Sequence, residues 1–233
     1  MQVRQYGSLE CTVLDPPQKV ERLVVLCHGW GAPGTDLVPL ASALCACEPS
    51  LQANTRFLFP AGPLAMAPGS RGWWALDTDR IYERIARGEV AAICEETPAG
   101  LPAARRQLMA TVDLALREAS LSCDRLVLGG FSQGAMLATD VALRLEECPD
   151  ALCVLSGALN SAPSWSLRAR QRRGLRVYQS HGTADPVLPF EVGQRLQQLL
   201  EEAGLKVSFE AFPDGHTIPS SVLRSLARHI AQP

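Results

Sequence analysis

The sequence predicts an α/β fold with a mostly parallel central sheet and helices on both of its faces. Three observations support this prediction: strand-like runs alternate with helix-like segments, several of the strand-like runs are apolar throughout, and reactive polar side chains follow four of them. Strands that are covered by helices on both faces read as continuous apolar runs instead of alternating ones. The pattern therefore indicates a doubly wound sheet whose functional groups collect at the carboxyl ends of the strands.

The expected elements are short strands with helix-like segments between and after them. The expected strands are the apolar runs at residues 11–14, 22–27, 56–59, 125–130, 151–156, 175–180 and 206–212. The expected helices lie between and after them, at residues 36–47, 77–87, 102–119, 133–146, 189–203 and 218–230.

The composition is that of an ordinary globular chain. With 233 residues, 47% of them hydrophobic and 20% charged, the chain can bury a substantial core, and no Pro/Gly/Ser linker or charge block divides it. We therefore expect residues 1–233 to form a single domain. The net charge of -2 gives no attraction toward nucleic acid or an anionic membrane surface. The arginines of RARQRRG, residues 168–174, are expected at a solvated helix end or loop.

Neither a membrane segment nor a metal site is expected. The first residues, MQVRQYGSLE, lack the apolar core of a signal peptide, and no run of about eighteen apolar residues could span a bilayer. The eight cysteines show neither CxxC pairs nor ligand-like Cys/His spacing, so a disulfide framework is not expected either. These features predict a cytoplasmic protein that uses no cofactor.

The stretch LVLGGFSQGAML, residues 126–137, passes from a strand-like run into a helix-like run with Ser132 at the junction. So sharp a turn forces the junction residue into a positive-φ conformation, and the glycines at positions 130 and 134 remove collisions across the bend. The serine hydroxyl then lies at a helix N-terminus, where free N–H groups favour developing negative charge. GxSxG also arises by chance in turns, but the strand before it and the helix after it favour a nucleophile.

A serine nucleophile needs a base within hydrogen-bond reach. Four histidines are available, and in the chain order serine, acid, histidine the base lies beyond Ser132. His216 follows the last expected strand in DGHTIP and is the predicted base, with a loop histidine bonded to the backbone as the alternative. His229 lies late in the last helix and is expected at the surface.

The acid that orients this base should lie on a loop after a strand. Asp185, in HGTADPVLP, meets this condition and is the predicted acid. Asp140 lies in the helix after the serine, Asp150 lies in a helix-to-strand turn, and Asp214 is expected to shape its own turn. Donors for a tetrahedral oxyanion are expected from the backbone N–H of Gln133 and from the glycine-rich loop CHGWGAPG, residues 27–34.

Four ordered motifs, LCHGWG, GFSQGAM, HGTADPVLP and DGHTIP, together resemble the phospholipase/carboxylesterase family of α/β-hydrolases. That family includes acyl-protein thioesterases and bacterial carboxylesterases, and the resemblance spans residues 22 to about 230. It implies an α/β-hydrolase fold without a large cap domain and an acyl-binding groove lined from the loop that contains RGWWALD. It further implies a triad and two oxyanion amides: Ser132, Asp185 and His216, with the backbone N–H groups of Trp30 and Gln133.

One motif departs from the family pattern. Acyl-protein thioesterases usually read HGLGD, whereas Trp30 replaces the leucine in this chain and Ala32-Pro33 follows. We therefore do not infer the substrate of that subfamily for this chain.

The substrate pocket is less clearly marked in the sequence. Trp73 and Trp74 lie in a Gly/Pro-rich loop and could equally wall an apolar acyl pocket, as the predicted substrate-binding residues, or cover the core. Leu64 and Met66 in the same segment are expected to pack in the ordinary way.

The leading hypothesis is a metal-independent serine hydrolase that cleaves small or medium carboxylic esters through an acyl-enzyme. Thioester or lysophospholipid hydrolysis is the alternative, because the same groups serve any activated acyl compound. A hydrolase-fold protein that binds a ligand without turnover is the alternative of another class, and an intact triad argues against it. The expected partner is a small-molecule ester or acyl substrate, with no nucleic acid and no stable membrane insertion, and a homodimer is left open.

Overall fold

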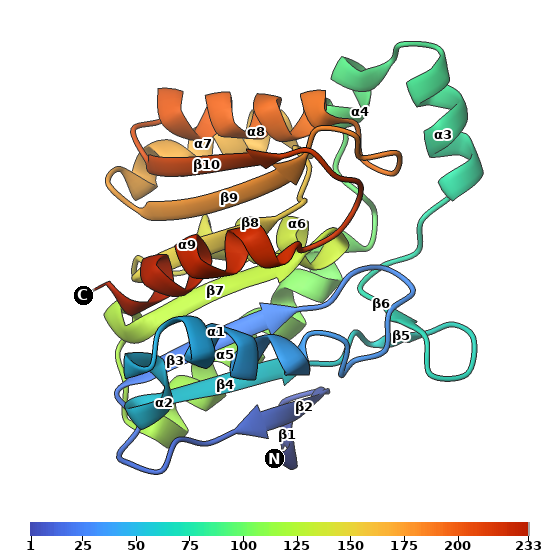
Figure 1. Cartoon of the computed structure of the whole chain (residues 1–233). Helices are drawn as coiled ribbons and strands as arrows, with labels where there is room; N and C mark the ends of the chain where they lie inside the picture. Colours follow the sequence, from blue (N-terminus) through green and yellow to red (C-terminus); the bar gives the residue numbers. More distant parts are fainter. Residues whose placement is uncertain (233) are drawn as a thin grey trace.

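The central feature of the computed structural model, which describes residues 1–232, is one large twisted sheet (Figure 1). Its strand order is β1-β2-β4-β3-β7-β8-β9-β10. In this sheet the pairs β1–β2 and β2–β4 are antiparallel, and the other pairs are parallel. The strands are β1 (Gln2–Tyr6), β2 (Leu9–Leu14), β3 (Arg22–Cys27), β4 (Thr55–Pro60), β7 (Leu126–Phe131), β8 (Ala151–Leu155), β9 (Arg176–Gly182) and β10 (Lys206–Phe212). The predicted mostly parallel sheet is confirmed.

Helices cover both faces of the sheet (Figure 1). One face packs against α1 (Val38–Cys47), α2 (Ser50–Asn54) and α9 (Ser220–Ala231). The other face packs against α5 (Leu101–Ala119), α6 (Gln133–Ala142), α7 (Ala162–Ala169) and α8 (Phe190–Glu202). The central strands β3, β4 and β8 are almost wholly buried, which explains their unbroken apolar sequences.

A small helical segment lies outside these layers. The helices α3 (Thr78–Ala86) and α4 (Val90–Glu95) project beyond the carboxyl edge of the sheet at one end of the molecule (Figure 1). A two-stranded ribbon of β5 (Leu64–Ala65) and β6 (Arg71–Gly72) lies before them in the chain. The fold therefore has a short helical cover and no large cap domain, as predicted.

Several elements differ from the prediction. The edge strand β1, the ribbon strands and the helices α2, α4 and α7 were not predicted, because all are short and β1 reads QVRQY with mostly polar side chains. The helix expected at 133–146 ends at Ala142. Beyond it, the amide of Arg144 donates a hydrogen bond to the Val141 carbonyl, three residues back, in place of the pattern of an α-helix. The described chain also contains two short 3-10 helices, η1 (Cys123–Arg125) and η2 (Arg170–Arg172). The second contains Arg170 and Arg172 of the arginine cluster at residues 168–174.

The prediction for His229 is wrong. Its side chain is buried, with a residue exposure of 8%, and its ring lies 5.8 Å from that of Tyr178. The reason is that α9 packs its apolar face on the sheet, and position 229 belongs to that face. Within residues 1–232, no helix is both long and apolar enough to cross a membrane.

Candidate active site

Ser132 occupies the sharp turn between β7 and α6. Its backbone has φ 54° and ψ -120°, a strained conformation for a residue with a side chain. A Cβ atom at Gly134 would lie 2.1 Å from the Cys27 carbonyl oxygen, and one at Gly130 would lie 2.6 Å from that same oxygen. The two glycines of GFSQG are therefore required because the turn passes this close to the end of β3.

The loop after β9 brings a carboxylate to a histidine from the loop after β10. The Oδ2 atom of Asp185 lies 2.6 Å from Nδ1 of His216. The other carboxylate oxygen, Oδ1, accepts hydrogen bonds of 2.8 and 2.9 Å from the backbone N–H groups of Val187 and Leu188. These bonds fix the orientation of the carboxylate, which in turn holds the imidazole with its Nδ1 toward the acid.

The charge of Asp185 is stabilised in this position. Burial alone raises the pKa of a carboxyl group, but hydrogen bonds from His216 and the two backbone amides outweigh it and hold the pKa of Asp185 below its ordinary value. A second buried ring, that of His181, has its Nε2 3.5 Å from Oδ2 of the same carboxylate. Burial lowers the pKa of His181, so we assign this ring as neutral and donating from Nε2 to the Leu188 carbonyl oxygen, 2.9 Å away.

Ser132 and His216 lie in the same region of the molecule. The His216 ring packs against the ring of Phe131, the residue before the serine, with centroids 4.7 Å apart. Among residues 1–232 the structure has no hydrogen bond between the Ser132 hydroxyl and the His216 ring. Catalytic hydrogen bonds are often long without substrate and shorten when the substrate binds. The lack of this hydrogen bond is therefore compatible with a serine–histidine pair.

Two backbone N–H groups near the serine lack protein acceptors. In the part of the chain described, neither the amide of Trp30 nor that of Gln133 donates to another residue. The loop that carries Trp30 is held by β6, because the Gly31 amide donates to the Arg71 carbonyl and the Arg71 amide donates to the Ala32 carbonyl, at 2.8 and 3.0 Å. Free N–H groups held on a fixed backbone are the arrangement that an oxyanion requires.

The ring of His28 connects this loop to the chain at Gly62 through hydrogen bonds. Its Nε2 accepts a 2.9 Å hydrogen bond from the Gly62 amide, which leaves the proton on Nδ1, and Nδ1 lies 2.8 Å from the Gly29 carbonyl oxygen. The indole N–H of Trp73 donates to the His28 carbonyl oxygen at 2.9 Å. Burial lowers the pKa of His28, in agreement with a neutral ring that positions the loop.

The side chain of Gln133 ties the nucleophile turn to the tryptophan loop. Its Oε1 accepts a hydrogen bond from the Trp73 amide and its Nε2 donates to the Trp74 carbonyl oxygen, both at 2.9 Å. The sequence indicated only the backbone amide of this residue. The position of a glutamine next to the nucleophile turn was the one sign of this role in the sequence. The partners of its side chain could not be predicted, because they depend on the tertiary fold.

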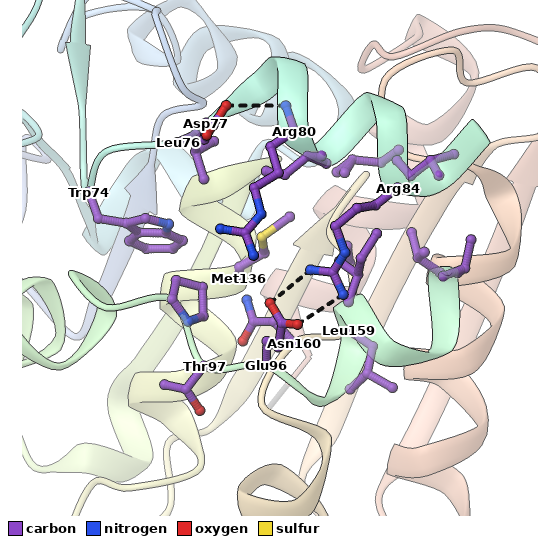
Figure 2. A pocket seen from close by; sticks show the side chains of 18 of the residues that line it. Trp74, Leu76, Asp77, Arg80, Arg84, Glu96, Thr97, Met136, Leu159 and Asn160 are labelled. Carbon is purple, nitrogen blue, oxygen red and sulfur yellow. Dashed lines mark hydrogen bonds and ion pairs between the residues drawn. The ribbon is translucent and has the colours of Figure 1, made fainter. Parts of the chain in front are cut away.

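A cavity of about 320 Å³ lies between the α3–α4 segment and the body of the protein (Figure 2). Its walls are largely apolar and include Trp74, Leu76, Met136 and Leu159. Of the two adjacent tryptophans, Trp74 therefore lines this cavity, whereas Trp73 packs against the His28 ring with centroids 5.3 Å apart. Ser132, Asp185 and His216 do not line it, and neither do Leu64 and Met66.

The cavity nevertheless adjoins the residues named above. Met136 lies four residues after Ser132 on α6, which is about one helical turn. Leu188, whose amide holds the Asp185 carboxylate, also lines the cavity wall. Asn160, which follows β8 and also lines it, was missed in the sequence because nothing in LSGALNS marks it as a functional residue. Across the described chain, no group of three His, Cys, Asp or Glu side chains is arranged to hold a metal ion.

A mostly parallel sheet covered on both faces, with a serine in a strained strand-to-helix turn, defines an α/β-hydrolase. Residues 10–232 match the family described as Phospholipase/Carboxylesterase. The chain belongs to that family and is an enzyme of the carboxylic ester hydrolase class.

Individual relatives agree with this assignment. The chain is 27% identical over 234 residues to acyl-protein thioesterase 1 of Mycosarcoma maydis, covering 94% of this chain and 95% of the relative. It is 28% identical over 208 residues to a probable carboxylesterase of Oryza sativa subsp. japonica, covering 86% and 83%. The crystal structure of esterase PE8 superposes with a TM-score of 0.79 at 26% identity, covering 94% of this chain and 96% of that one.

Proposed function

We propose that this chain hydrolyses small or medium carboxylic esters through an acyl-enzyme on Ser132. The observation that carries this proposal is the 2.6 Å contact between Nδ1 of His216 and Oδ2 of Asp185, beside the turn that holds the serine. An imidazole held in this way has its Nε2 free to act as a general base. The cavity of about 320 Å³ lies at the lower end of the range for ligand pockets, about 300–1,000 Å³, and suits a substrate of modest size.

In the proposed reaction, the Ser132 oxygen attacks the ester carbonyl carbon and its proton passes to Nε2 of His216. The N–H groups of Trp30 and Gln133 stabilise the negative charge that develops on the carbonyl oxygen. The bond to the alcohol then breaks, and His216 returns the proton to the departing oxygen. Water attacks the acyl-serine by the same route in reverse, which releases the acid and restores the hydroxyl. The negative charge of Asp185 stabilises the imidazolium that forms in each step.

The test is covalent labelling by a fluorophosphonate probe. We expect the wild type and Ser120→Ala to be labelled and to hydrolyse aryl esters, whereas Ser132→Ala does neither. Ser120 is a matched control because it has the same φ of 54° but lies at the end of α5. Labelling of Ser132→Ala at the wild-type rate would assign the nucleophile to another residue.

Thioester hydrolysis is a second candidate, because a relative covered over 95% of its length is an acyl-protein thioesterase. The ratio of kcat/KM for an ester and a thioester of the same acyl chain distinguishes the two. A ratio above one supports the ester as the preferred substrate, and a ratio far below one supports the thioester.

We also propose a cytoplasmic location and a small-molecule substrate as the main partner. All eight cysteines are unpaired, as is usual in a reducing compartment. Gel filtration coupled to light scattering tests whether the chain forms a homodimer.

A further inference from the structure

A second buried imidazole lies beside the acid, and the proposed reaction does not use it. His181 is the penultimate residue of β9 and has a residue exposure of 0%. Its Nε2 lies 2.9 Å from the Leu188 carbonyl oxygen and 3.5 Å from Oδ2 of Asp185. Burial of a polar ring costs free energy unless the ring makes hydrogen bonds, so the presence of this histidine needs an explanation.

The surroundings of the ring decide which of its nitrogens carries the proton. A carbonyl oxygen and a carboxylate oxygen both accept hydrogen bonds, so we assign Nε2 of His181 as the donor. Within residues 1–232, Nδ1 of the same ring has no hydrogen-bond partner. The fold therefore keeps the imidazole for the contacts of its Nε2, although the burial of Nδ1 is unfavourable.

The neighbouring helix leaves space for this ring. Gly193 lies in α8, which covers β9 and β10, and a Cβ atom at Gly193 would lie 2.6 Å from Nδ1 of His181 (Figure 1). Glycine inside a helix is less favourable than alanine, so helix propensity does not explain it. The Gly193 carbonyl also accepts a 2.8 Å hydrogen bond from the side chain of Gln179 in β9. The glycine therefore allows α8 to approach the ring closely, which confines the imidazole.

From these distances we infer that His181 is a positioning residue, which holds the loop of Asp185 so that its carboxylate faces His216. The inference rests on the proposed function, in which Asp185 orients the base. The connection runs through Leu188, whose carbonyl accepts the N–H of His181 and whose amide donates to Oδ1 of Asp185 at 2.9 Å. His181 therefore fixes the residue whose amide holds the acid.

The two oxygens of Asp185 have different partners, so His181 does not compete with the base. Oδ1 accepts hydrogen bonds from the amides of Val187 and Leu188, whereas Oδ2 lies 2.6 Å from Nδ1 of His216. The 3.5 Å contact between His181 and Oδ2 is longer than an ordinary hydrogen bond. A donor at this distance limits the rotation of the carboxylate and leaves the short contact to His216 intact.

The experiment compares two substitutions of His181 in the hydrolysis of an aryl ester. His181→Phe keeps a ring but has no N–H, and we expect kcat of the folded fraction to fall about 10- to 100-fold while KM changes less than about twofold. His181→Gln can place an amide N–H near the position of Nε2, and its kcat should stay within about threefold of the wild-type value. His229→Phe, the same substitution at a buried histidine of α9, is the control and should leave kcat unchanged.

A double-mutant cycle tests whether His181 acts through Asp185. In the Asp185→Asn background, His181→Phe should lower kcat by less than about a further twofold, because the orienting carboxylate is already absent. An equal factor in the two backgrounds would show that the imidazole acts on the fold as a whole, and it would overturn the inference. Wild-type kcat in His181→Phe, a loss confined to KM, or an equal loss in His181→Gln would overturn it as well.

If His181→Phe does not fold, Gly193→Ala gives a second test, because its methyl group displaces the ring from its place beside α8. We expect kcat to fall at least about tenfold, although alanine favours the helix, whereas Gln194→Ala at the next, exposed position should have no effect. A wild-type kcat in Gly193→Ala would contradict the role of His181. Failure of the proposed function looks different, because the wild type would then hydrolyse no aryl ester and Ser132 would not be labelled.

Discussion

The carboxylate of Asp185 and the imidazole of His216 are separated by 31 residues in the chain and by 2.6 Å between Oδ2 and Nδ1. They meet because β9 and β10 are parallel neighbours, so the loops that follow the two strands leave the same edge of the sheet. The loops also pack closely: a Cβ at Gly182 would lie 2.3 Å from the Gly215 carbonyl oxygen.

Replacement of the acid should remove most of the activity without unfolding the protein. We expect Asp185→Asn to lower kcat for an aryl ester by up to about ten-thousandfold, because the amide no longer fixes the imidazole tautomer or stabilises the imidazolium. Asp214→Asn is the control, since that exposed carboxylate bonds only to the next backbone amide. An equal loss in both variants would argue against Asp185 as the orienting acid.

The side chain of Gln133 is expected to act separately from its backbone amide. Gln133→Leu keeps the backbone N–H but breaks both hydrogen bonds to the tryptophan loop. We expect a loss of about 1–3 kcal/mol in the free energy of unfolding, because the buried groups of that loop lose their partners. We also expect a lower kcat, measured on the folded fraction.

The matched control for Gln133→Leu is Gln198→Leu, which changes an exposed glutamine bonded to Glu202. This control should change neither the free energy of unfolding nor kcat. A Gln133→Leu protein with wild-type stability would show that the two hydrogen bonds do not hold the loop.

Asp140, which the sequence set aside as the triad acid because it lies in the helix after the serine, is a buried carboxylate with several partners. Its side chain is fully buried and contacts Arg105 at 2.9 Å, Arg144 at 3.0 Å and the indole N–H of Trp165 at 2.8 Å. We expect Asp140→Ala to cost about 3–5 kcal/mol, because it leaves two guanidinium groups without their shared partner. Urea unfolding measures this loss.

An exposed ion pair provides the comparison. Asp113→Ala removes the contact with Arg117 at 3.0 Å on the surface of α5 and should cost less than about 1 kcal/mol. Similar losses for the two variants would contradict the structural role of Asp140.

His229 should make the stability depend on pH. Burial, together with the nearby positive charge of Arg176, lowers the pKa of His229 to about 4, whereas an unfolded histidine titrates near 6.5. The folded protein therefore favours the neutral ring, and its contribution to stability is present above about pH 6.5 and is lost as the pH falls toward 4. The full effect is on the order of 3 kcal/mol.

In His229→Phe this part of the pH dependence should disappear. Urea unfolding at several values between pH 4 and 7 measures it, with the neighbouring Arg228→Gln as a control that keeps the wild-type slope. An unchanged slope in His229→Phe would assign the effect to other groups.

The sequence predicts the bounds of two strands without error: β3, which helices bury, and the edge strand β10, in which polar and apolar side chains alternate. The bounds of β3 and β10, residues 22–27 and 206–212, agree with the prediction. The edge strand β1 was missed because most of its side chains face solvent and carry no apolar signal. The burial of His229 was also missed, because a histidine is polar and its position on the buried side of α9 depends on how the helix packs on the sheet.

The candidate site divides in a similar way. Ser132, Asp185 and His216 could be named from the sequence because each follows a predicted strand, and their catalytic roles stay predictions. The side-chain partners of Gln133 and His28 could not be named, since they lie on loops whose approach is set by the whole fold. Asn160 is defined only by the cavity around it, and a cavity has no local pattern in a sequence.

The helix α3, which lies over the cavity, buries none of its side chains. Every residue of α3 is at least partly exposed, and the cavity side of Arg84 is held by surface carboxylates. Elements with few buried contacts open at the lowest free energy. We therefore expect α3 to move at a lower free-energy cost than the sheet or the turn at Ser132, so that motion above the cavity leaves the nucleophile turn in place.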